Sequence, residues 1–499
     1  MTSVPARPNI VLIMTDDHAA HAIGAYGSVV NRTPRIDEIG ARGARLEHCF
    51  ATNALCTPSR ASILTGTYSH VNQVTTLSTP FDASQPTFVL QLRDAGYRTG
   101  IVGKWHMGQG PGHDPEGFDY WDVLIDQGEY HDPRFLSADG LRTEQGYATN
   151  VITDLALRWV ESLDADRTTA DQPWCLLIWH KAPHRPWEPD DAHAQMFTDP
   201  IPVPATFTDD YATRTSSARR ALMRVADQLT ITDLKQPPPD GLDYQQLAAW
   251  KYQRYMQDYL ACVASVDDNV GRVLDWLTER GELDDTLLAY TSDQGFFLGD
   301  HGWFDKRFMY EESLRMPFLV SYPRRIEPGQ VHSGIVSNVD FARTLLDAAE
   351  VAPHPRMQGR SFFGDLAGDP ADPAPGLYYR YYEHADASHN APAHYGYRTD
   401  RYKIIYFYND GLGLPGTGPL TYYPEWELYD LVTDPHELTN VYHDPGYADV
   451  RDEMTLALWD GQHRLGDTPH PSQPVPIGAG PTPRWRALST LITAAKLET

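Results

Sequence analysis

The side chains best placed to do chemistry are acidic residues that follow two apolar runs. Asp16 and Asp17 end the segment NIVLIMTDD, and Asp293 and Gln294 follow the apolar run of TLLAYTSDQG. Carboxylate and amide oxygens suit Ca²⁺ or Mg²⁺ better than zinc or copper. Either acidic segment alone is an ordinary turn former. Because two strand patterns lead into such segments, we predict that these four residues bind one divalent cation.

A cysteine close to a predicted helix start is the second candidate. Cys56 lies two residues before Pro58 and four before Arg60, in the segment CTPSR. Proline suits the first turn of a helix because its missing N–H costs nothing there. A helix N-terminus and an arginine both stabilise negative charge on a neighbouring group. We therefore expect Cys56 to be the position of a nucleophile that attacks an anionic ester.

Basic side chains follow two further strand patterns. Lys104 and His106 end the segment TGIVGKWH, and His184 follows the apolar segment WCLLIW. The spacing of two places Lys104 and His106 on the same face of the chain. A surface patch or a structural histidine is the alternative interpretation. Ligands of open parallel sheets bind at the carboxyl ends of the strands, so four such ends favour a single site.

The elements that must position these residues alternate between strand and helix patterns. Strands are expected at residues 9–17, 99–106, 174–184, 286–295 and 316–323, and helices at 33–43, 87–96, 146–163, 244–281 and 339–350. This alternation predicts an α/β domain over residues 1–370, with a mostly parallel central sheet flanked by helices. Aromatic, alternating segments then predict a smaller antiparallel sheet plus helix (448–463) in a C-terminal subdomain, residues 371–499, with a proline-rich tail.

Composition limits the partners of the chain. Its 499 residues carry a formal net charge of −26, which argues against nucleic acid and against anionic membrane surfaces. No apolar stretch approaches the ~20 residues of a membrane span, and no signal peptide is visible. We expect a cytoplasmic protein from the sequence as given, or a periplasmic or secreted one if a leader was removed. An anionic substrate would need a locally positive pocket.

Several segments resemble type I sulfatases of the alkaline phosphatase-like superfamily. CTPSR followed by ASILTG is similar to the family signature, whose cysteine is converted to formylglycine after translation. NIVLIMTDDH, GKWHMG, APHRPW, SDQGFFLGDHGWFDKR and LYDLVTDPHELTN resemble further family segments in the same order, up to about residue 441. The resemblance implies hydrolysis of a sulfate ester by the hydrated aldehyde at Cys56, with release of inorganic sulfate. It also implies a formylglycine-generating enzyme as a partner during maturation.

The resemblance also implies a role for each matching residue. One divalent metal ion, Ca²⁺ in preference to Mg²⁺, would be bound by Asp16, Asp17, modified Cys56, Asp293 and Gln294. Many relatives have asparagine at the last position, and glutamine keeps the amide oxygen. The catalytic set would be Cys56, Arg60 to orient the formylglycine, Lys104, His106 and Lys306 around nucleophile and sulfate, and His184 to protonate the leaving alcohol.

The substrate is predicted less directly. The segment GDHGWFDKRFMYEES resembles carbohydrate and glycosaminoglycan sulfatases such as N-acetylglucosamine-6-sulfatases, so we expect a sulfated saccharide. His301, His394 and Arg398 are expected to contact the sugar, with a place in the core as the alternative for each. Two other functions stay open: a phosphonate monoester or phosphodiester hydrolase with the same nucleophile, and a catalytically silent carbohydrate-binding relative. The sequence leaves the oligomeric state open.

Overall fold

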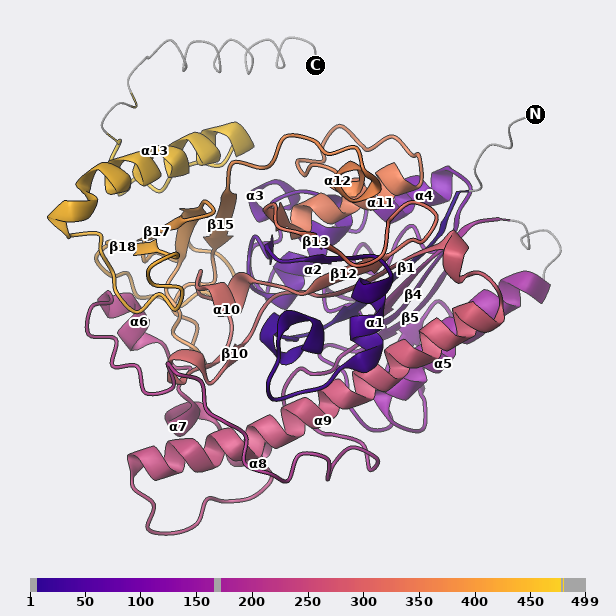
Figure 1. Cartoon of the computed structure of the whole chain (residues 1–499), viewed down its shortest axis with the longest axis horizontal. Helices are drawn as coiled ribbons and strands as arrows, with labels where there is room; N and C mark the ends of the chain where they lie inside the picture. The colour runs from indigo at the N-terminus through magenta and orange to yellow at the C-terminus, as the bar shows by residue number, and fades with distance from the viewer. Residues whose placement is uncertain (1–6, 166–171, 477–478, 480–499) are drawn as a thin grey trace.

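A ten-stranded sheet forms the centre of the molecule (Figure 1). The computed structural model describes residues 7–165, 172–476 and 479. The strand order is β13-β2-β12-β9-β1-β8-β4-β5-β6-β7. The strands are β1 (Asn9–Thr15), β2 (Ala44–Leu46), β4 (Arg98–Lys104), β5 (Tyr120–Leu124), β6 (Arg134–Ser137), β7 (Gly140–Thr143), β8 (Trp174–Trp179), β9 (Thr286–Ser292), β12 (Phe318–Ser321) and β13 (Gln330–His332).

Five neighbouring strands of this sheet run parallel. β9, β1, β8, β4 and β5 pair in that order, with Ile13 of β1 opposite both Ile178 of β8 and Tyr290 of β9. β12, β6 and β7 pair antiparallel to their neighbours at the two sides of this parallel block. The mostly parallel sheet predicted from the sequence is confirmed. Its parallel arrangement brings the carboxyl ends of five strands to one edge.

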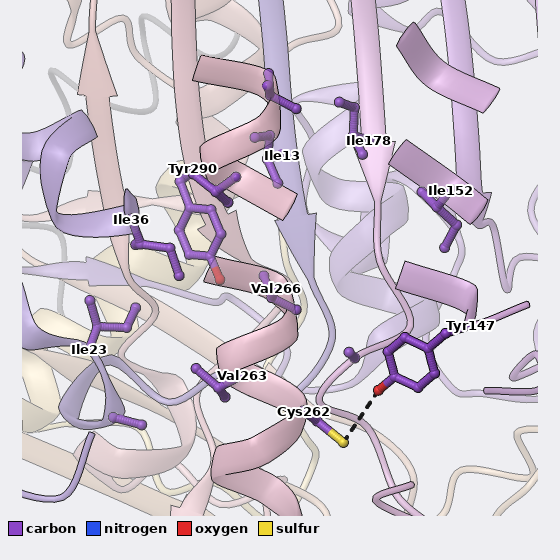
Figure 2. Packing of buried hydrophobic residues seen from close by; sticks show 14 of the residues in the cluster. Ile13, Ile23, Ile36, Tyr147, Ile152, Ile178, Cys262, Val263, Val266 and Tyr290 are labelled. Carbon is purple, nitrogen blue, oxygen red and sulfur yellow. Dashed lines mark hydrogen bonds between the residues drawn. The ribbon is translucent and has the colours of Figure 1, made fainter. Parts of the chain in front are cut away.

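Helices cover both faces of the sheet. α1 (Pro34–Arg42), α5 (Ala148–Ala165) and α9 (Tyr244–Glu279) pack on one face, whereas α2 (Cys56–Thr65), α4 (Phe88–Asp94), α11 (Phe341–Ala348) and α12 (Phe363–Ala367) pack on the other. Figure 2 shows Ile13 and Ile178 of the sheet packed with Val263 and Val266 of α9. Burial of these alternating side chains contributes about 25 cal/mol per Å² of apolar surface and holds the strand ends in place.

A smaller antiparallel sheet follows in the chain. Its strands pair in sequence order: β15 (Leu377–Tyr381), β16 (His394–Arg398), β17 (Tyr402–Phe407) and β18 (Glu425–Asp430). α13 (Ala448–Leu465) packs on one face of it through Met454 and Leu458. This sheet and helix, predicted from the sequence, are confirmed. The proline-rich tail is described only to residue 476 and at residue 479, and there Asp467 binds Arg380 with an oxygen–nitrogen distance of 2.7 Å.

Short elements connect these layers. The remaining strands are β3 (Cys49–Phe50), β10 (Phe297–Leu298), β11 (Phe304–Asp305) and β14 (Val336–Ser337), and the short α-helices are α3 (Ser69–Asn72), α6 (Ser216–Arg220), α7 (Val225–Gln228), α8 (Ile231–Leu234) and α10 (Glu311–Leu314). Single 3₁₀ turns are Ala20–Ala22, Gly24–Tyr26, Leu283–Asp285, Asp300–Gly302, Asn338–Asp340 and Pro445–Tyr447. Within the described ranges, no helix has both the length and the apolar character that a membrane crossing needs.

Candidate active site

Two neighbouring strands deliver the predicted metal ligands to one point. Thr15, the last residue of β1, lies opposite Ser292, the last residue of β9. Asp16 and Asp17 therefore emerge beside Asp293, and the Asp17 amide donates a hydrogen bond of 3.3 Å to Asp293 Oδ1. Oxygens of Asp16, Asp17 and Asp293 all lie within 4.8 Å of one another. The structure thus brings the three carboxylates together, as the sequence predicted.

The chemistry of these donors fits a hard cation. The three carboxylates are buried, and burial raises the pKa of Asp17 to about 7 and that of Asp293 to about 6. The amide nitrogen of Gln294 donates to Asp17 Oδ1 at 2.6 Å. Its buried Oε1 has no hydrogen-bond partner within the described part of the chain. Buried polar groups are normally satisfied, so an oxygen left bare among crowded carboxylates is suited to a divalent cation.

Cys56 begins α2 at the same place. Its Sγ lies 3.3 Å from Asp16 Oδ1, and only 1% of the residue is exposed. Burial and the neighbouring Asp16 raise the pKa of the thiol, so an unmodified Cys56 stays protonated at neutral pH. Residues outside α2 hold the start of this helix. Asn338 Nδ2 donates to Ser59 Oγ at 2.8 Å, and the Ser59 hydroxyl donates to the Asp293 carbonyl.

Arg60 lies one helical turn later and ties the carboxylates to one another. Its Nε is 3.0 Å from Asp293 Oδ2, and one terminal nitrogen is 3.0 Å from Asp16 Oδ2. The other terminal nitrogen donates to the Lys104 carbonyl at 2.5 Å, and the guanidinium lies over the Trp179 ring, 5.3 Å from its centre. The residue is fully buried. Arg60 therefore holds the ends of three strands in register around Cys56.

Two lysines contact different carboxylates of the acidic cluster. Lys104 Nζ forms an ion pair with Asp16 Oδ2. Lys306 Nζ lies 2.6 Å from Asp17 Oδ1 and 3.7 Å from Cys56 Sγ. With Arg60, three cations oppose three carboxylates. One bound dication would leave the cluster positively charged, which would let an anionic group bind in a molecule of net charge −26.

The two predicted catalytic histidines lie at the rim of the cluster. His184 Nε2 is 3.8 Å from Asp17 Oδ2, and its Nδ1 lies 2.6 Å from the Arg185 carbonyl. His106 Nδ1 lies 3.5 Å from the Thr57 hydroxyl. Burial and the charge of Lys104 hold the pKa of both histidines well below the usual range. Both rings are therefore neutral at pH 7.

A cleft opens beside His106. Its volume is about 330 Å³, and it is lined by Leu77, Ser78, Thr79, Pro80, His106, Gly108, Gln109 and Asp126. His106 also accepts a hydrogen bond of 2.7 Å at its carbonyl from the hydroxyl of Thr57, the residue after Cys56. The cleft therefore lies beside the start of α2.

Three residues expected to contact a sugar lie elsewhere. His394 is buried in an aromatic group, with its ring centre 5.0 Å from that of Phe407. His301 is also fully buried, with Nδ1 2.9 Å from Asp209 Oδ2. Arg398 binds Glu311 at 3.0 Å and lines a separate cavity of about 420 Å³. Both histidines are buried, as the alternative of a place in the core implies, and the sugar contacts expected of the three residues stay a prediction.

Sequence motifs missed several polar residues near the site. Gln127 accepts a hydrogen bond from Lys104 Nζ, and Lys181 is buried nearby, with its pKa lowered to about 8 by burial. Arg307 follows Lys306 and reaches His389 at 3.3 Å. Only the position of Arg307 beside Lys306 could have drawn attention to it. A single glutamine in a loop carries no recognisable pattern.

Comparison with known families identifies the chain. The family model described as Sulfatase matches residues 8–351, which is more than half of the sequence. The chain belongs to the sulfatase family. A second model, described as N-sulphoglucosamine sulphohydrolase, C-terminal, matches residues 299–464. The predicted family, fold class and sulfate ester hydrolysis are confirmed for this sulfatase.

Relatives of known structure or activity agree with this membership. The sulfatase is 40% identical to N-acetylglucosamine-6-O-sulfatase of Bacteroides thetaiotaomicron, over 92% of this chain and 87% of the relative. A solved structure of a protein bound to its substrate D-glucosamine-2-N,6-O-disulfate is 40% identical, with a TM-score of 0.84 over 92% of this chain and 98% of that one. A phosphonate monoester hydrolase of Agrobacterium radiobacter shares the fold, at 22% identity and a TM-score of 0.68 over 94% of this chain and all of that one.

Proposed function

We propose that this sulfatase removes a 6-O-sulfate from a glucosamine-type saccharide, with a formylglycine made from Cys56 and one Ca²⁺ or Mg²⁺ ion. The observation that carries the mechanism is the convergence of Cys56, three carboxylates and two lysines in one buried cluster. The substrate class is supported by the relative at 40% identity, which is an N-acetylglucosamine-6-O-sulfatase.

The cation would be held by Asp16, Asp17, Asp293 and Gln294, with the oxygen of modified Cys56 beside them. Their buried, oxygen-only donor set and the bare Gln294 Oε1 support this assignment. When bound, the ion supplies Lewis acid chemistry at the nucleophile and the sulfate. It would also offset the repulsion that now raises the pKa of Asp17 and Asp293, after the effect of burial itself.

Conversion of Cys56 is supported by the state of its thiol. Only a thiolate is a good nucleophile, and burial keeps this thiol protonated. An aldehyde in its place supplies a hydrated carbon, which can attack sulfur with one hydroxyl and release sulfate with the other. The first position of α2 adds a helix N-terminus, which stabilises negative charge there.

The chain's own residues would bind the sulfate and supply the proton. Lys104 and Lys306 contact the carboxylates beside Cys56, and each could bind a sulfate oxygen. The Nδ1 proton of His184 is engaged by the Arg185 carbonyl, so Nε2 faces the cluster. We propose that Nε2 takes up a proton from solvent when the anionic substrate binds, and that it gives this proton to the departing sugar oxygen, which leaves as the alcohol. Its 3.8 Å distance from Asp17 Oδ2 would favour the charged ring at that stage.

The sugar would occupy the cleft beside His106. Next to Lys306 in the chain is Arg307, which is 3.2 Å from Glu383 Oε1, and His389 lies 3.3 Å from Asp305 Oδ2. Paired carboxylate and guanidinium groups are suited to sugar hydroxyls, because together they offer acceptors and donors.

Mass spectrometry of the peptide that contains Cys56 tests the nucleophile. We expect loss of sulfur and gain of an aldehyde oxygen in active protein, and an intact thiol in fully active protein would contradict the proposal. Parallel assays of glucosamine 6-O-sulfate and a phosphodiester test the substrate. Faster turnover of the phosphodiester would favour the phosphodiesterase function instead.

A further inference from the structure

The segment 125–130 reaches the site from a side that no sequence motif marks. It follows β5, the neighbour of β4 in the sheet. Gln127 Oε1 accepts a hydrogen bond from Lys104 Nζ, and the Gln127 carbonyl accepts one from Lys181 Nζ at 3.2 Å. The Tyr130 hydroxyl donates to the His184 carbonyl at 2.7 Å. One short segment therefore contacts residues at the ends of both β4 and β8.

The backbone of this segment is fixed, so the Gln127 amide is held in place. Gly128 has φ +73°, and a Cβ there would lie 2.6 Å from Leu124 Cδ1. The Gly128 amide donates to the Ile125 carbonyl at 2.8 Å, and Arg134 binds Glu129 at 2.7 Å. Contacts on both sides of Gln127 thus determine where its side chain can point.

Lys104 benefits from a neutral acceptor at this position. An ammonium group has three N–H donors. Asp16 and Gln127 each accept one of them, which leaves one for a sulfate oxygen. An amide takes up a donor without adding negative charge beside a bound anion, whereas a carboxylate would repel it. Without the Gln127 side chain, Asp16 would be the remaining one of these two acceptors, and the Lys104 ammonium would turn toward Asp16.

We propose that Gln127 is a positioning residue for the hydrolysis, acting through Lys104 rather than through the substrate. It orients the Lys104 ammonium between Asp16 and the sulfate. Lys181 supports it by binding the Gln127 carbonyl while its own ammonium lies 4.7 Å from the centre of the Tyr130 ring. The inference rests on the proposed function, since it needs Lys104 to bind the sulfate group.

A double-mutant cycle tests this role on glucosamine 6-O-sulfate. Gln127→Met removes the acceptor and keeps the length of the side chain. We expect kcat/KM to fall about 10- to 100-fold, the range for one charge-assisted hydrogen bond. In a Lys104→Met background the same change should cost less than about threefold, because residues that act through one another are not additive. Equal losses in both backgrounds would overturn the proposal.

Gln127→Glu gives a second readout that does not need turnover by the Lys104 variant. It keeps an acceptor oxygen, so kcat should stay within about threefold of the value for the parent sequence. KM should rise, because the added charge repels the substrate. Equal falls in kcat for Gln127→Glu and Gln127→Met would contradict positioning. If the enzyme of the parent sequence, with Cys56 converted, cleaves no sulfate ester, the proposed function fails instead.

Gln91→Met is the matched control. Gln91 is also a half-buried glutamine, and it donates to the Thr87 carbonyl within α4, away from the site. The same substitution there should leave kcat and KM unchanged. Thermal unfolding of all variants separates a loss of folding from a loss of function. Gln127→Met should melt within a few degrees of the parent protein. A much lower midpoint with unchanged kcat in the folded fraction would make Gln127 structural and overturn the inference.

Discussion

The small sheet and the edge of the large sheet both bury polar side chains, but they satisfy them differently. Glu427 on β18 is fully buried and accepts four hydrogen bonds, from the amide and hydroxyl of Thr215 and from the hydroxyls of Tyr310 and Tyr429. Gln294 at the end of β9 is equally buried, yet its Oε1 meets no donor among the residues that the structure describes.

This difference separates a structural role from a functional one. An unsatisfied buried polar atom costs about 1–3 kcal/mol, so Glu427 contributes to stability as the chain stands. The crowded carboxylates and the bare Gln294 Oε1 are destabilising as the chain stands, which is typical of functional sites, and the proposed cation would offset this cost. Substitutions in the two regions should therefore change different measurements.

The largest expected effect is loss of activity at Cys56. Cys56→Ala removes the proposed nucleophile, so kcat should fall on the order of 10⁴-fold or more. Stability should change little, because alanine fits a helix N-terminus and leaves no buried charge unpaired. Steady-state kinetics and thermal unfolding measure the two effects. Residual activity within about tenfold of that of the parent enzyme would show that Cys56 is not the nucleophile.

In the small sheet we expect a loss of stability with little change in activity. Glu427→Ala leaves Thr215, Tyr310 and Tyr429 without their acceptor, and should lower the free energy of unfolding by about 4 kcal/mol. The kcat of the folded fraction should stay within about twofold, because the residue does not contact the acidic cluster. Denaturant titration with parallel kinetics checks both. A specific loss of kcat at full stability would end the distinction between the two regions.

A smaller, pH-dependent effect is expected at His301. Although burial lowers its pKa, a hydrogen bond to Asp209 and the nearby charge of Glu312 raise it to about 9. Protonated His301 therefore stabilises the folded chain below about pH 6.5, and this contribution of about 3 kcal/mol is lost as the pH rises through 9. The free energy of unfolding should fall more between pH 6 and pH 9.5 in the parent protein than in the His301→Gln variant. An identical pH dependence in both would contradict this role.

The sequence predicts most of the large domain because strand patterns and motifs coincide there. Apolar runs that lead into Asp16 or Asp293 predict parallel strands at 9–17 and 286–295, and the observed strands end two or three residues earlier, at Thr15 and Ser292. Parallel pairing then brings these residues together, as the register between β1 and β9 shows. A helix start at Cys56 follows from Pro58. Local pattern and overall fold agree at these points.

The sequence could not distinguish a ligand from a packed ring. His394 lies in an aromatic segment, and such a segment can either contact a sugar or pack in the hydrophobic core. Only the pairing of β16 with β17 shows that its ring faces Phe407. Gln127 failed to stand out for the opposite reason, because its role depends on the tertiary proximity of β5 to β4. Both cases need distances that no spacing along the chain encodes.

Metal analysis of purified protein tests the central claim most directly, that one dication completes the acidic cluster. Elemental mass spectrometry should find one Ca²⁺ or Mg²⁺ ion per active chain, and Asp17→Asn combined with Asp293→Asn should remove it together with activity. Removal by a chelator should also lower the thermal midpoint, because a bound ion stabilises only the folded state. Fully active protein with no bound divalent ion, or a double variant that keeps the ion, would contradict the account.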